Sequence, residues 1–426
     1  MAMSKRISGF TKSVLGFSIF QFIVVIIGLR IPYIYFVWLL VCAGLSFNKE
    51  SKFQFAMLFC SIPYTMVMKL TPSSISFYTF LMLMIALFQL IKGHLIKRKF
   101  VIALMIFITV SFWGISGAST DWIKMIMGFF LLYKFCQQNN SNDLVGYVSG
   151  YSIGLLGASL IGLEKTNNVL IGKYFSDLNS EYINGATIYR FSALYEDPNY
   201  FSISVVIAVF IILLLTVYKR VNKVAGIIMG LILIAFGSIS YSKMFFVAIV
   251  ACLAVLALVK IRKTKYFFPK LIGFGLIAVG LVYFMQRSSY YSGIMGRFQK
   301  NDFSNGRFQL LNMYITYIFS SVKTMIIGEG IGAGFVGTHG PHNTYVELLY
   351  HFGIVGSVSY LWALFCSLKT SNTVRVRKVE SLTLIAVFMF MIGTLGVLKM
   401  NDMILYYMII YATCDFIDNV DRELKV

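Results

Sequence analysis

The sequence predicts an all-α polytopic integral membrane protein in which residues 1–426 form a single transmembrane domain. Of its 426 residues, 58% are hydrophobic and only 13% are charged, whereas a soluble domain carries about a quarter charged residues. Apolar runs long enough to cross a bilayer recur along the chain, and such a backbone is satisfied in hydrocarbon as a helix. Short basic clusters separate these runs, as is typical of cytoplasmic loops.

The basic clusters predict the topology. If they all face the cytoplasm, the apolar runs alternate consistently and both termini lie inside. The formal net charge of +20 then reflects topology, and we expect no nucleic-acid partner. Residues 1–12 are basic and lead into a first helix, because no small-residue cleavage site follows them. The clusters assigned to the cytoplasm are Lys5/Arg6/Lys12, Lys49/Lys52, Lys92/Lys97/Arg98/Lys99, Lys134, Lys219/Arg220/Lys223, Lys260/Arg262/Lys263/Lys265 and Lys369/Arg375/Arg377/Lys378.

This alternation predicts about fourteen transmembrane helices. The segments near 54–68 and 122–136 are short for a span. If both were re-entrant or interfacial, about twelve spans would remain, and all later segments would keep their orientation because two crossings cancel. The predicted spans lie near 13–29, 31–46, 54–68, 75–91, 100–116, 122–136, 144–163, 198–217, 224–239, 243–259, 270–286, 353–369, 380–397 and 403–417.

Two predicted connections on the outer side are too long to be simple turns, a first loop at 164–197 and a larger second loop at 287–352. Long loops usually carry function. In the second loop, residues 308–319 predict an amphipathic helix on the membrane surface, because polar residues recur there at every fourth position. Both loops also carry positive charge on the side where Lys and Arg are disfavoured, so we expect an anion there. These outer basic residues are Lys173, Arg190, Arg287, Arg297, Lys300, Arg307 and Lys323.

The positions of ionisable residues favour a surface enzyme over a transporter. Transporters place acids, bases or broken helices near the bilayer midplane. The predicted spans are nearly empty of charge, and the remaining ionisable residues gather in the two outer loops and at the outer ends of helices. This distribution indicates chemistry at the outer interface. The residues at outer helix ends are Lys124, Lys243, Lys399 and Asp402.

The first candidate motif is Arg-Phe-Ser-Ala-Leu-Tyr-Glu-Asp-Pro-Asn at 190–199. Asp197 is a predicted helix N-cap and Pro198 the first helical residue, and capping alone would explain both. Capping does not explain Arg190, and a guanidinium beside a helix N-terminus makes an anion site. We therefore assign Arg190, together with Glu196, Asp197 and Asn199, to substrate binding.

The second candidate motif, Ser-Ile-Ser-Tyr-Ser-Lys at 238–243, predicts a short outer turn that ends at the mouth of a span. Lys243 either extends to the lipid headgroups, as many interfacial lysines do, or contacts a phosphate from within this tight turn.

The third candidate region begins at Gly306 and Arg307 and continues through a glycine-rich segment at 328–337. Its end fits the pattern GxGxxG, but no predicted strand precedes it, which argues against a dinucleotide site. The glycines either permit a tight exposed turn or expose backbone N–H groups to an anion.

Three histidines and one acid follow within a short stretch, at His339, His342, Glu347 and His351. Their spacing matches no standard zinc motif, so a metal site is the less favoured reading and we predict neither a metal nor a cofactor. His342 is the candidate general base or substrate-binding group. We expect His351 to be structural.

In this order, the motifs resemble the O-antigen polymerase and ligase (Wzy/WaaL) superfamily, most of all a Wzy-type polymerase. The resemblance covers about residues 190–356 and includes Gly-Glu-Gly-Ile-Gly and His-Asn-Thr-Tyr-Val-Glu followed by Phe-Gly-Ile-Val-Gly. The family's outer basic positions fall on Lys243 and Arg307, and its histidine falls on His342. The family usually has arginine at the position of Lys243, and lysine cannot form the same planar fork with pyrophosphate.

The resemblance implies a metal-independent, GT-C-like glycosyltransferase of the bacterial inner membrane, with its active site facing the periplasm. It would polymerise undecaprenyl-pyrophosphate-linked repeat units into O-antigen or a related surface polysaccharide. Arg190, Lys243 and Arg307 would bind pyrophosphate and stabilise the leaving group, and His342 would deprotonate the acceptor hydroxyl.

Several alternatives and partners accompany this hypothesis. Asn343 would bind substrate beside His342, and Glu196 or Asp197 is the alternative base. A ligase that transfers glycan to lipid A core is the nearest alternative function, and a lipid-linked glycan flippase or small-molecule transporter is the alternative from another class. The implied partners are the glycan donor and acceptor, membrane lipid and a chain-length regulator. Outer-loop tyrosines that would stack on sugars are Tyr182, Tyr189, Tyr195, Tyr290, Tyr291 and Tyr345.

Overall fold

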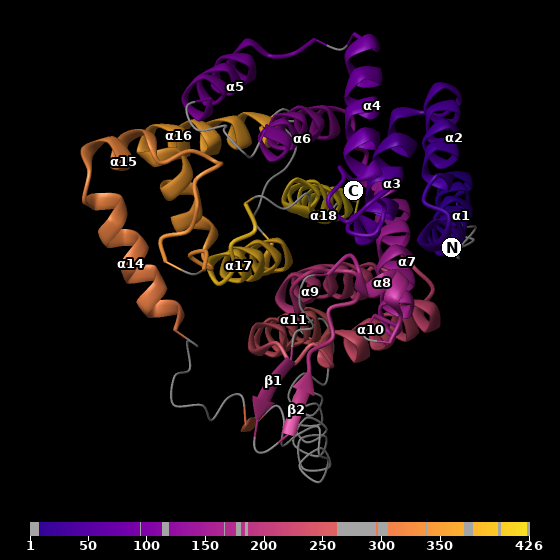
Figure 1. Ribbon diagram of the computed structural model, residues 1–426. Helices are drawn as coiled ribbons and strands as arrows, with labels where there is room; N and C mark the ends of the chain where they lie inside the picture. Colours follow the sequence, from indigo (N-terminus) through magenta and orange to yellow (C-terminus); the bar gives the residue numbers. More distant parts are fainter. Residues whose placement is uncertain are drawn as a thin grey trace. The chain divides into compact units, whose positions relative to one another are not determined.

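The described part of the computed structural model is helical, with one short hairpin in the predicted first outer loop (Figure 1). The predicted span at 270–286 and the basic residues Arg287, Arg297, Lys300 and Lys399 lie outside the described residues, as do Tyr290 and Tyr291. The described residues are 8–93, 95–112, 119–165, 167–175, 180–183, 186–261, 295–296, 306–337, 339–369, 378–398 and 402–423.

Each predicted span that falls on described residues coincides with a helix. The helices at these positions are α1 (Gly9–Arg30), α2 (Ile34–Asn48), α3 (Ser51–Ser61), α4 (Phe77–Ile91), α5 (Arg98–Ser111), α6 (Ser119–Gln138), α7 (Leu144–Gly162), α9 (Pro198–Val217), α10 (Lys223–Ser238), α11 (Lys243–Ile261), α16 (Thr344–Leu368), α17 (Val379–Gly393) and α18 (Asp402–Glu423). Helix α3 ends well before residue 68, where the predicted span ends. A 3-10 turn that contains Pro63 follows it, because proline cannot continue the hydrogen-bond ladder of an α-helix.

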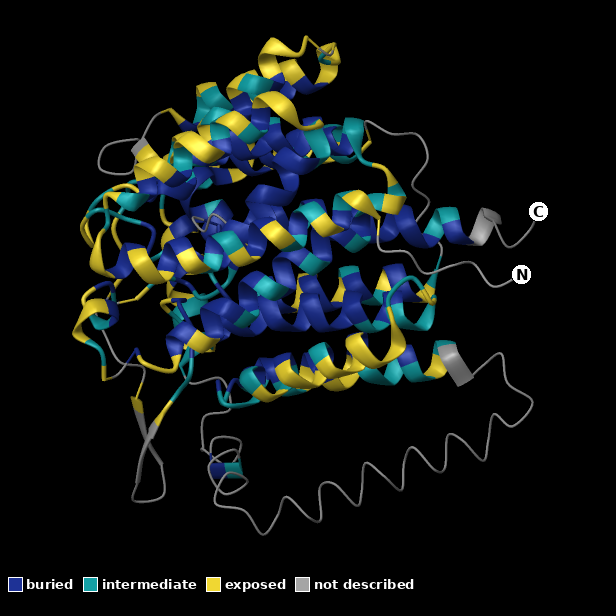
Figure 2. Ribbon diagram, turned by 90° about the vertical axis from the view of Figure 1, so that its right-hand side faces the viewer, coloured by how far each residue is buried: buried dark blue, intermediate teal, exposed yellow. Residues whose placement is uncertain are grey.

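Five helical segments in the described part of the chain are long and apolar enough to cross a membrane, which supports an all-α membrane protein. They are Gly9–Arg30, Ser141–Gly162, Pro198–Val217, Thr344–Leu368 and Met403–Val420. Shorter apolar helices accompany them, and many of their large apolar residues are exposed. Figure 2 marks exposed residues in yellow. Leu40 on α2 is 72% exposed, Leu231 on α10 is 60% exposed and Val250 on α11 is 64% exposed. Such surfaces are typical of helices that face lipid.

A 3-10 turn at Ser141–Asp143 precedes α7, and the remaining helices and strands lie in the two predicted outer loops. The first loop contains α8 (Val169–Gly172) and an antiparallel hairpin of β1 (Ser180–Ile183) and β2 (Ala186–Tyr189), in which Ser180 pairs with Tyr189. The second contains α14 (Arg307–Phe319), α15 (Val322–Ile327) and the first part of α16. The hairpin was not expected from the sequence, and α16 begins at Thr344 rather than near residue 353.

A helix, α14, is present where the surface helix was predicted at 308–319. Tyr314 and Ile318 are buried on one side, whereas Phe308 is 73% exposed and Phe319 is 64% exposed. Exposed aromatic residues on a short helix are the pattern of a segment at a membrane surface, and that location stays a prediction.

The described chain divides into two compact units. Unit 1 contains residues 1–6, 155–305 and 377–388, and unit 2 contains residues 7–154, 306–376 and 389–426. Two of the unit boundaries fall within α7 and α17, and a single domain stays a prediction.

Unit 1 is built around α9, whose residues are buried along most of its length. The helix begins as the sequence predicts, because Asp197 adopts an extended conformation, accepts a hydrogen bond from the backbone N–H of Asn199 and is followed by Pro198. Helices α10 and α11 pack against α9. Tyr218, just after α9, donates to Glu380 at the start of α17 over 3.0 Å, which joins two helix ends that are both predicted to be cytoplasmic.

Unit 2 contains a chain of amide side chains that joins four helix ends. Gln138 donates to Gln89 over 2.9 Å, Gln89 donates to Gln54 over 2.6 Å, and Gln54 donates to the backbone carbonyl of Ser46 over 2.9 Å. The four residues belong to the end of α6, the end of α4, the start of α3 and the end of α2. All four ends are predicted to be cytoplasmic. Their contact agrees with that topology, because helix ends that touch must lie on the same side of the membrane. The membrane face on which they lie stays a prediction.

Helix α16 is broken at Gly353, whose φ is +59°. The break leaves backbone carbonyls of the preceding turn available to other donors. Two of them accept from the glycine-rich segment: Glu329 N–H bonds to Tyr350 O and Gly330 N–H bonds to His351 O, both at 2.9 Å. Gly328, at φ +73°, lies where the glycine-rich segment crosses α16, so close that a Cβ on it would lie 2.5 Å from the backbone of His351. This part of the segment is therefore buried against α16 and is not the exposed turn that we expected; only the later glycines, such as Gly334, are exposed.

Replacing Gly353 with alanine is expected to destabilise the protein. A non-glycine residue in this backbone region costs about 1–3 kcal/mol, and the added Cβ would collide with the backbone of Ile326. A lower melting temperature and a smaller monodisperse fraction after detergent extraction are expected. Gly334→Ala is the matched control, because no atom lies within 4 Å of a Cβ at that position. Equal melting temperatures for the two variants would show that the crossing does not need Gly353.

Candidate functional site

In unit 1, the start of α9 is joined to the turn at 238–243 through Asn199. The backbone N–H of Asn199 donates to Asp197 Oδ1 at 2.6 Å, which is the capping bond. The side-chain oxygen of Asn199 accepts from Ser242 Oγ at 2.7 Å and from Arg190 Nη2 at 3.3 Å. Asn199 is buried, so it holds the other residues in place, whether or not it also binds substrate as predicted.

Arg190 is half-buried and is fixed to the same turn. Its Nε donates to the backbone carbonyl of Ser240 at 3.2 Å, and the next residue, Phe191, donates its N–H to Ile239 O at 3.1 Å. A guanidinium held on two sides before substrate arrives is preorganised, which is what electrostatic stabilisation of a developing charge requires. The motif at 190–199 and the motif at 238–243 therefore come together, and the bonded residues Asn199 and Ser242 are 43 positions apart in the chain.

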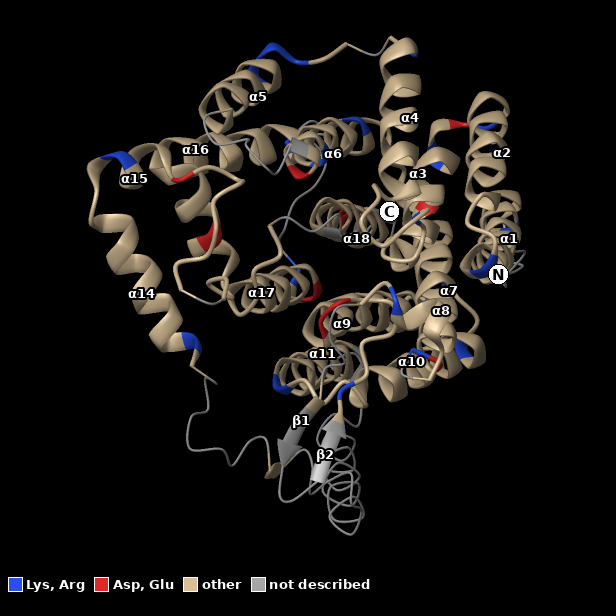
Figure 3. Ribbon diagram, viewed as in Figure 1, with Lys and Arg blue, Asp and Glu red and all other residues tan. Residues whose placement is uncertain are grey.

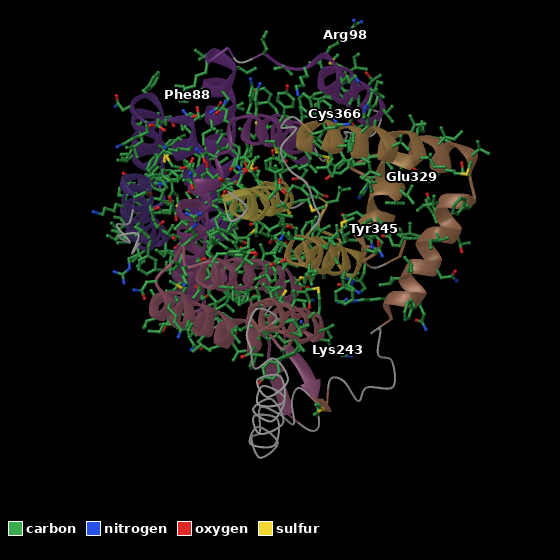
Figure 4. All side chains as sticks on the ribbon, turned by 180° about the vertical axis from the view of Figure 1, so that it is seen from behind. Phe88, Arg98, Lys243, Glu329, Tyr345 and Cys366 are labelled. Carbon is green, nitrogen blue, oxygen red and sulfur yellow. The ribbon has the colours of Figure 1, made fainter. Side chains whose placement is uncertain are left out.

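Lys243 is the first residue of α11 and follows this turn directly (Figure 4). The turn is tight, because Tyr241 adopts a left-handed conformation with φ +50°. Ser240 and Ser242 are buried, and Ser240 Oγ lies 3.0 Å from Ser202 Oγ on α9. The backbone on the N-terminal side of Lys243 is thus well fixed.

The same region contains a buried lysine that the sequence-based prediction did not include. Lys165 is 7% exposed, and its ammonium donates to Ser192 Oγ and to Tyr195 O, both at 2.8 Å. Burial lowers the pKa of Lys165 to about 8, although the negative charges of Glu196 and Asp197 act in the opposite direction. Lys165 is a basic residue on the predicted outer side, so the argument that singled out Arg190 applies to it as well.

The two acids considered as alternative bases differ in their surroundings. Glu196 is exposed, and Asp197 is half-buried with Oδ1 committed to the cap of α9. A proton transfer to Asp197 would weaken that cap, because a protonated carboxyl is a poorer acceptor for the backbone N–H. Glu196 is therefore the better placed of the two as an alternative base.

In unit 2, Arg307 and Asn343 meet at the end of α17. Arg307 is the first residue of α14, after Gly306 in a left-handed conformation at φ +78°, and its Nη1 donates to Thr394 O at 2.9 Å. Asn343 Nδ2 donates to the preceding carbonyl, that of Gly393, at 2.8 Å. Two residues of separate predicted motifs thus bind consecutive carbonyl groups.

His342 immediately precedes Asn343 and is half-buried in a left-handed conformation, with φ +46°. Asn343 is the N-cap of α16, because its Oδ1 accepts from the N–H groups of Tyr345 at 3.0 Å and Val346 at 3.2 Å. This cap was not predicted. It fixes the backbone of His342 next to the carbonyls that bind Arg307 and Asn343, and Figure 4 labels Tyr345 in the first turn of the helix.

Further bonds hold the segment after α17 against the start of α16. Thr344 Oγ1 donates to Leu395 O at 2.6 Å, and Glu347 Oε2 accepts from the N–H of Leu398 at 3.1 Å. Glu347 is buried. The sequence analysis considered Glu347 as a metal ligand, whereas in the structure its carboxylate accepts from a backbone N–H.

The other two histidines have different surroundings. His351 is buried with Nδ1 2.8 Å from Gly330 O, which agrees with the expected structural role. His339 is exposed, and its backbone carbonyl accepts from the hydroxyl of Tyr314 at 3.0 Å. Among the described residues, no three side chains of His, Cys, Asp or Glu come together as a set of metal ligands.

The predicted site residues thus form two groups. Unit 1 holds Arg190, Glu196, Asp197, Asn199 and Lys243, and unit 2 holds the others, Arg307, His342 and Asn343. Comparison with protein-family models and with curated protein sequences finds no match for this chain. The functional argument therefore depends on the side chains themselves.

Proposed function

We propose that the protein is a metal-independent, GT-C-like glycosyltransferase that polymerises undecaprenyl-pyrophosphate-linked oligosaccharide repeat units. The proposed location is the bacterial inner membrane, with both termini in the cytoplasm and the active site facing the periplasm. The product would be O-antigen or a related surface polysaccharide.

The observation that carries this proposal is the arrangement around the end of α17. Arg307 and Asn343 bind the carbonyls of Thr394 and Gly393, and His342 is held beside Asn343 at the start of α16. A cation and an imidazole on one rigid frame fit an anionic leaving group and an acceptor hydroxyl. The group in unit 1 supports the same chemistry, because Arg190 and Lys243 flank one fixed turn.

The reaction is a displacement at the anomeric carbon of the donor. The acceptor hydroxyl oxygen forms the new bond to that carbon, and the bond from the carbon to the pyrophosphate oxygen breaks. Undecaprenyl pyrophosphate leaves with the electron pair. A preorganised cation stabilises its added charge, and this is the role proposed for Arg307 in unit 2 and, separately, for Arg190 and Lys243 in unit 1. His342 takes the proton of the acceptor hydroxyl.

The charge distribution favours this enzyme over a flippase or transporter. Most charged residues in the described chain lie at helix ends or in the connecting segments, as Figure 3 shows. In unit 2, Gln54 and Gln89 link buried helix ends as neutral amides, and the buried acid Asp415, which accepts from Asn139, belongs to the last part of α18. Coupled transport through the bilayer centre usually needs ionisable groups there.

Reconstitution tests the proposal against its two alternatives. The purified protein is placed in liposomes with lipid-linked repeat units, with and without lipid A core, and the glycans are separated on a gel. A ladder of products without core is expected. Product that forms only with core would mean a ligase, and unchanged substrate on the opposite leaflet would mean a flippase. Either of these outcomes would overturn the proposed polymerase.

A further inference from the structure

The segment 190–197 is attached at both ends, through Arg190 to the turn at 238–243 and through Asp197 to α9. Lys165, which follows the end of α7, attaches its middle. The ammonium donates to the hydroxyl of Ser192 and to the carbonyl of Tyr195, each at 2.8 Å. The same ammonium lies 3.5 Å from the centre of the Phe175 ring. An ammonium has three N–H donors, and a hydroxyl, a carbonyl and a ring face are three suitable partners.

The backbone of the same segment is pressed against the end of α7. A Cβ on Gly162 would lie 2.6 Å from the Cα of Ala193, so the glycine permits a close approach. Ala193 adopts a left-handed conformation with φ +47°, which persists only where the surroundings hold it. The bonds from Lys165 lie on both sides of this residue, at Ser192 and Tyr195. Lys165 therefore stabilises the bend that places Arg190 at the turn.

We propose that Lys165 is a positioning residue that holds the segment 190–197 in the conformation in which Arg190 binds the pyrophosphate of the lipid-linked donor. The inference depends on the proposed function for the identity of the ligand. The anchoring itself depends only on the contacts of Lys165 within unit 1.

The buried charge also gives the segment a pH dependence with a definite sign. The pKa of Lys165 is about 8 in the closed arrangement and would return to about 10.4 if the segment opened and exposed the amine. The open form binds more protons between these values, so raising the pH favours the closed form. The charged groups that act on Lys165 are Glu196 and Asp197, while the Tyr195 hydroxyl bonds to Ser204.

Hydrogen exchange measured by mass spectrometry tests the anchoring in substrate-free protein in nanodiscs. In Lys165→Met, peptides that cover 190–197 are expected to exchange about tenfold faster or more. Lys165→Arg should restore part of the protection. The matched control is Lys173→Met, since Lys173 is an exposed lysine of the same loop.

The pH dependence of exchange is a second measurement. Between about pH 7 and pH 9.5, the protection of residues 190–197, corrected for intrinsic exchange rates, should rise in the natural protein and stay level in Lys165→Met. Unchanged exchange in Lys165→Met would overturn the proposal.

A double-mutant cycle tests whether Lys165 acts through Arg190. The probe is inorganic pyrophosphate, with binding followed by calorimetry. Lys165→Met is expected to weaken binding about tenfold when Arg190 is present and to have little further effect in Arg190→Gln. Equal losses in both backgrounds would overturn positioning through Arg190. If Arg190→Gln alone leaves pyrophosphate binding unchanged, Arg190 does not bind pyrophosphate, and Lys165 cannot position it for that purpose. The hydrogen-exchange experiment would still decide whether Lys165 anchors the segment 190–197.

Discussion

Replacing Arg307 with alanine is expected to lower the rate of polymer formation by about a hundred- to a thousand-fold, the effect of removing one preorganised donor from a site of developing charge. The guanidinium lies at the start of α14 and is fixed by its bond to the carbonyl of Thr394. Alanine removes both the charge and that bond. The measurement is the initial rate of ladder formation in the liposome assay, at matched amounts of inserted protein.

Two further substitutions separate charge from geometry at this position. Arg307→Lys keeps the positive charge but not the planar fork, so we expect an activity between those of the natural protein and Arg307→Ala. Lys323→Ala is the matched control, because it removes an exposed positive charge from the same predicted outer loop. If Lys323→Ala lowered the rate as much as Arg307→Ala, the loss would come from the general charge of the loop, and Arg307 would have no specific role.

The parts of the fold that the sequence predicts are those governed by local rules. Helix α9 begins where Asp197 and Pro198 predict, because capping and the fixed φ of proline act within a few residues. Helix α14 begins at Arg307, and the polar residues Asn312, Thr316 and Ser320, whose spacing predicted a helix, are exposed. The helix positions likewise follow from apolar runs of sufficient length.

The features that the sequence does not predict depend on contacts between distant segments. Nothing local indicates that Gly328 and Gly353 cross, because each glycine is compatible with a simple turn. The hairpin of β1 and β2 is an exception, because it is local and the sequence-based prediction missed its signal: Asn-Gly at 184–185 stands between two short runs rich in Tyr, Ile and Thr. The burial of Lys165 depends on Ser192, Tyr195 and Phe175, which lie 10 or more residues away along the chain.

The candidate site shows the same division. The residue types and their order identify Arg190, Lys243, Arg307 and His342 as candidates. Only the folded chain shows that Arg190 bonds to the turn before Lys243, and that Arg307 and Asn343 bond to neighbouring carbonyls. The carbonyls of Gly393 and Thr394 belong to the backbone, so no side-chain pattern indicates them.

Replacing His342 with asparagine is expected to lower kcat by about a hundred- to ten-thousand-fold with little change in KM, as expected for loss of a general base. Asparagine is the informative substitution because His342 has φ +46°. Asparagine tolerates this left-handed conformation better than most residues, so the backbone before the cap of α16 should be preserved. Alanine would remove the imidazole and strain the backbone at once.

Comparison of several substitutions shows which property of His342 matters. If His342→Asn and His342→Gly kept full activity while His342→Ala lost it, the residue would serve the backbone conformation and not proton transfer. If all three variants lost activity to a similar degree, the imidazole itself would be required. His339→Asn is the matched control, since that side chain is exposed and only its backbone carbonyl bonds to Tyr314. If His342 is the general base, His339→Asn should keep the natural rate, because the imidazole of His342 is intact in that variant and still takes the acceptor proton.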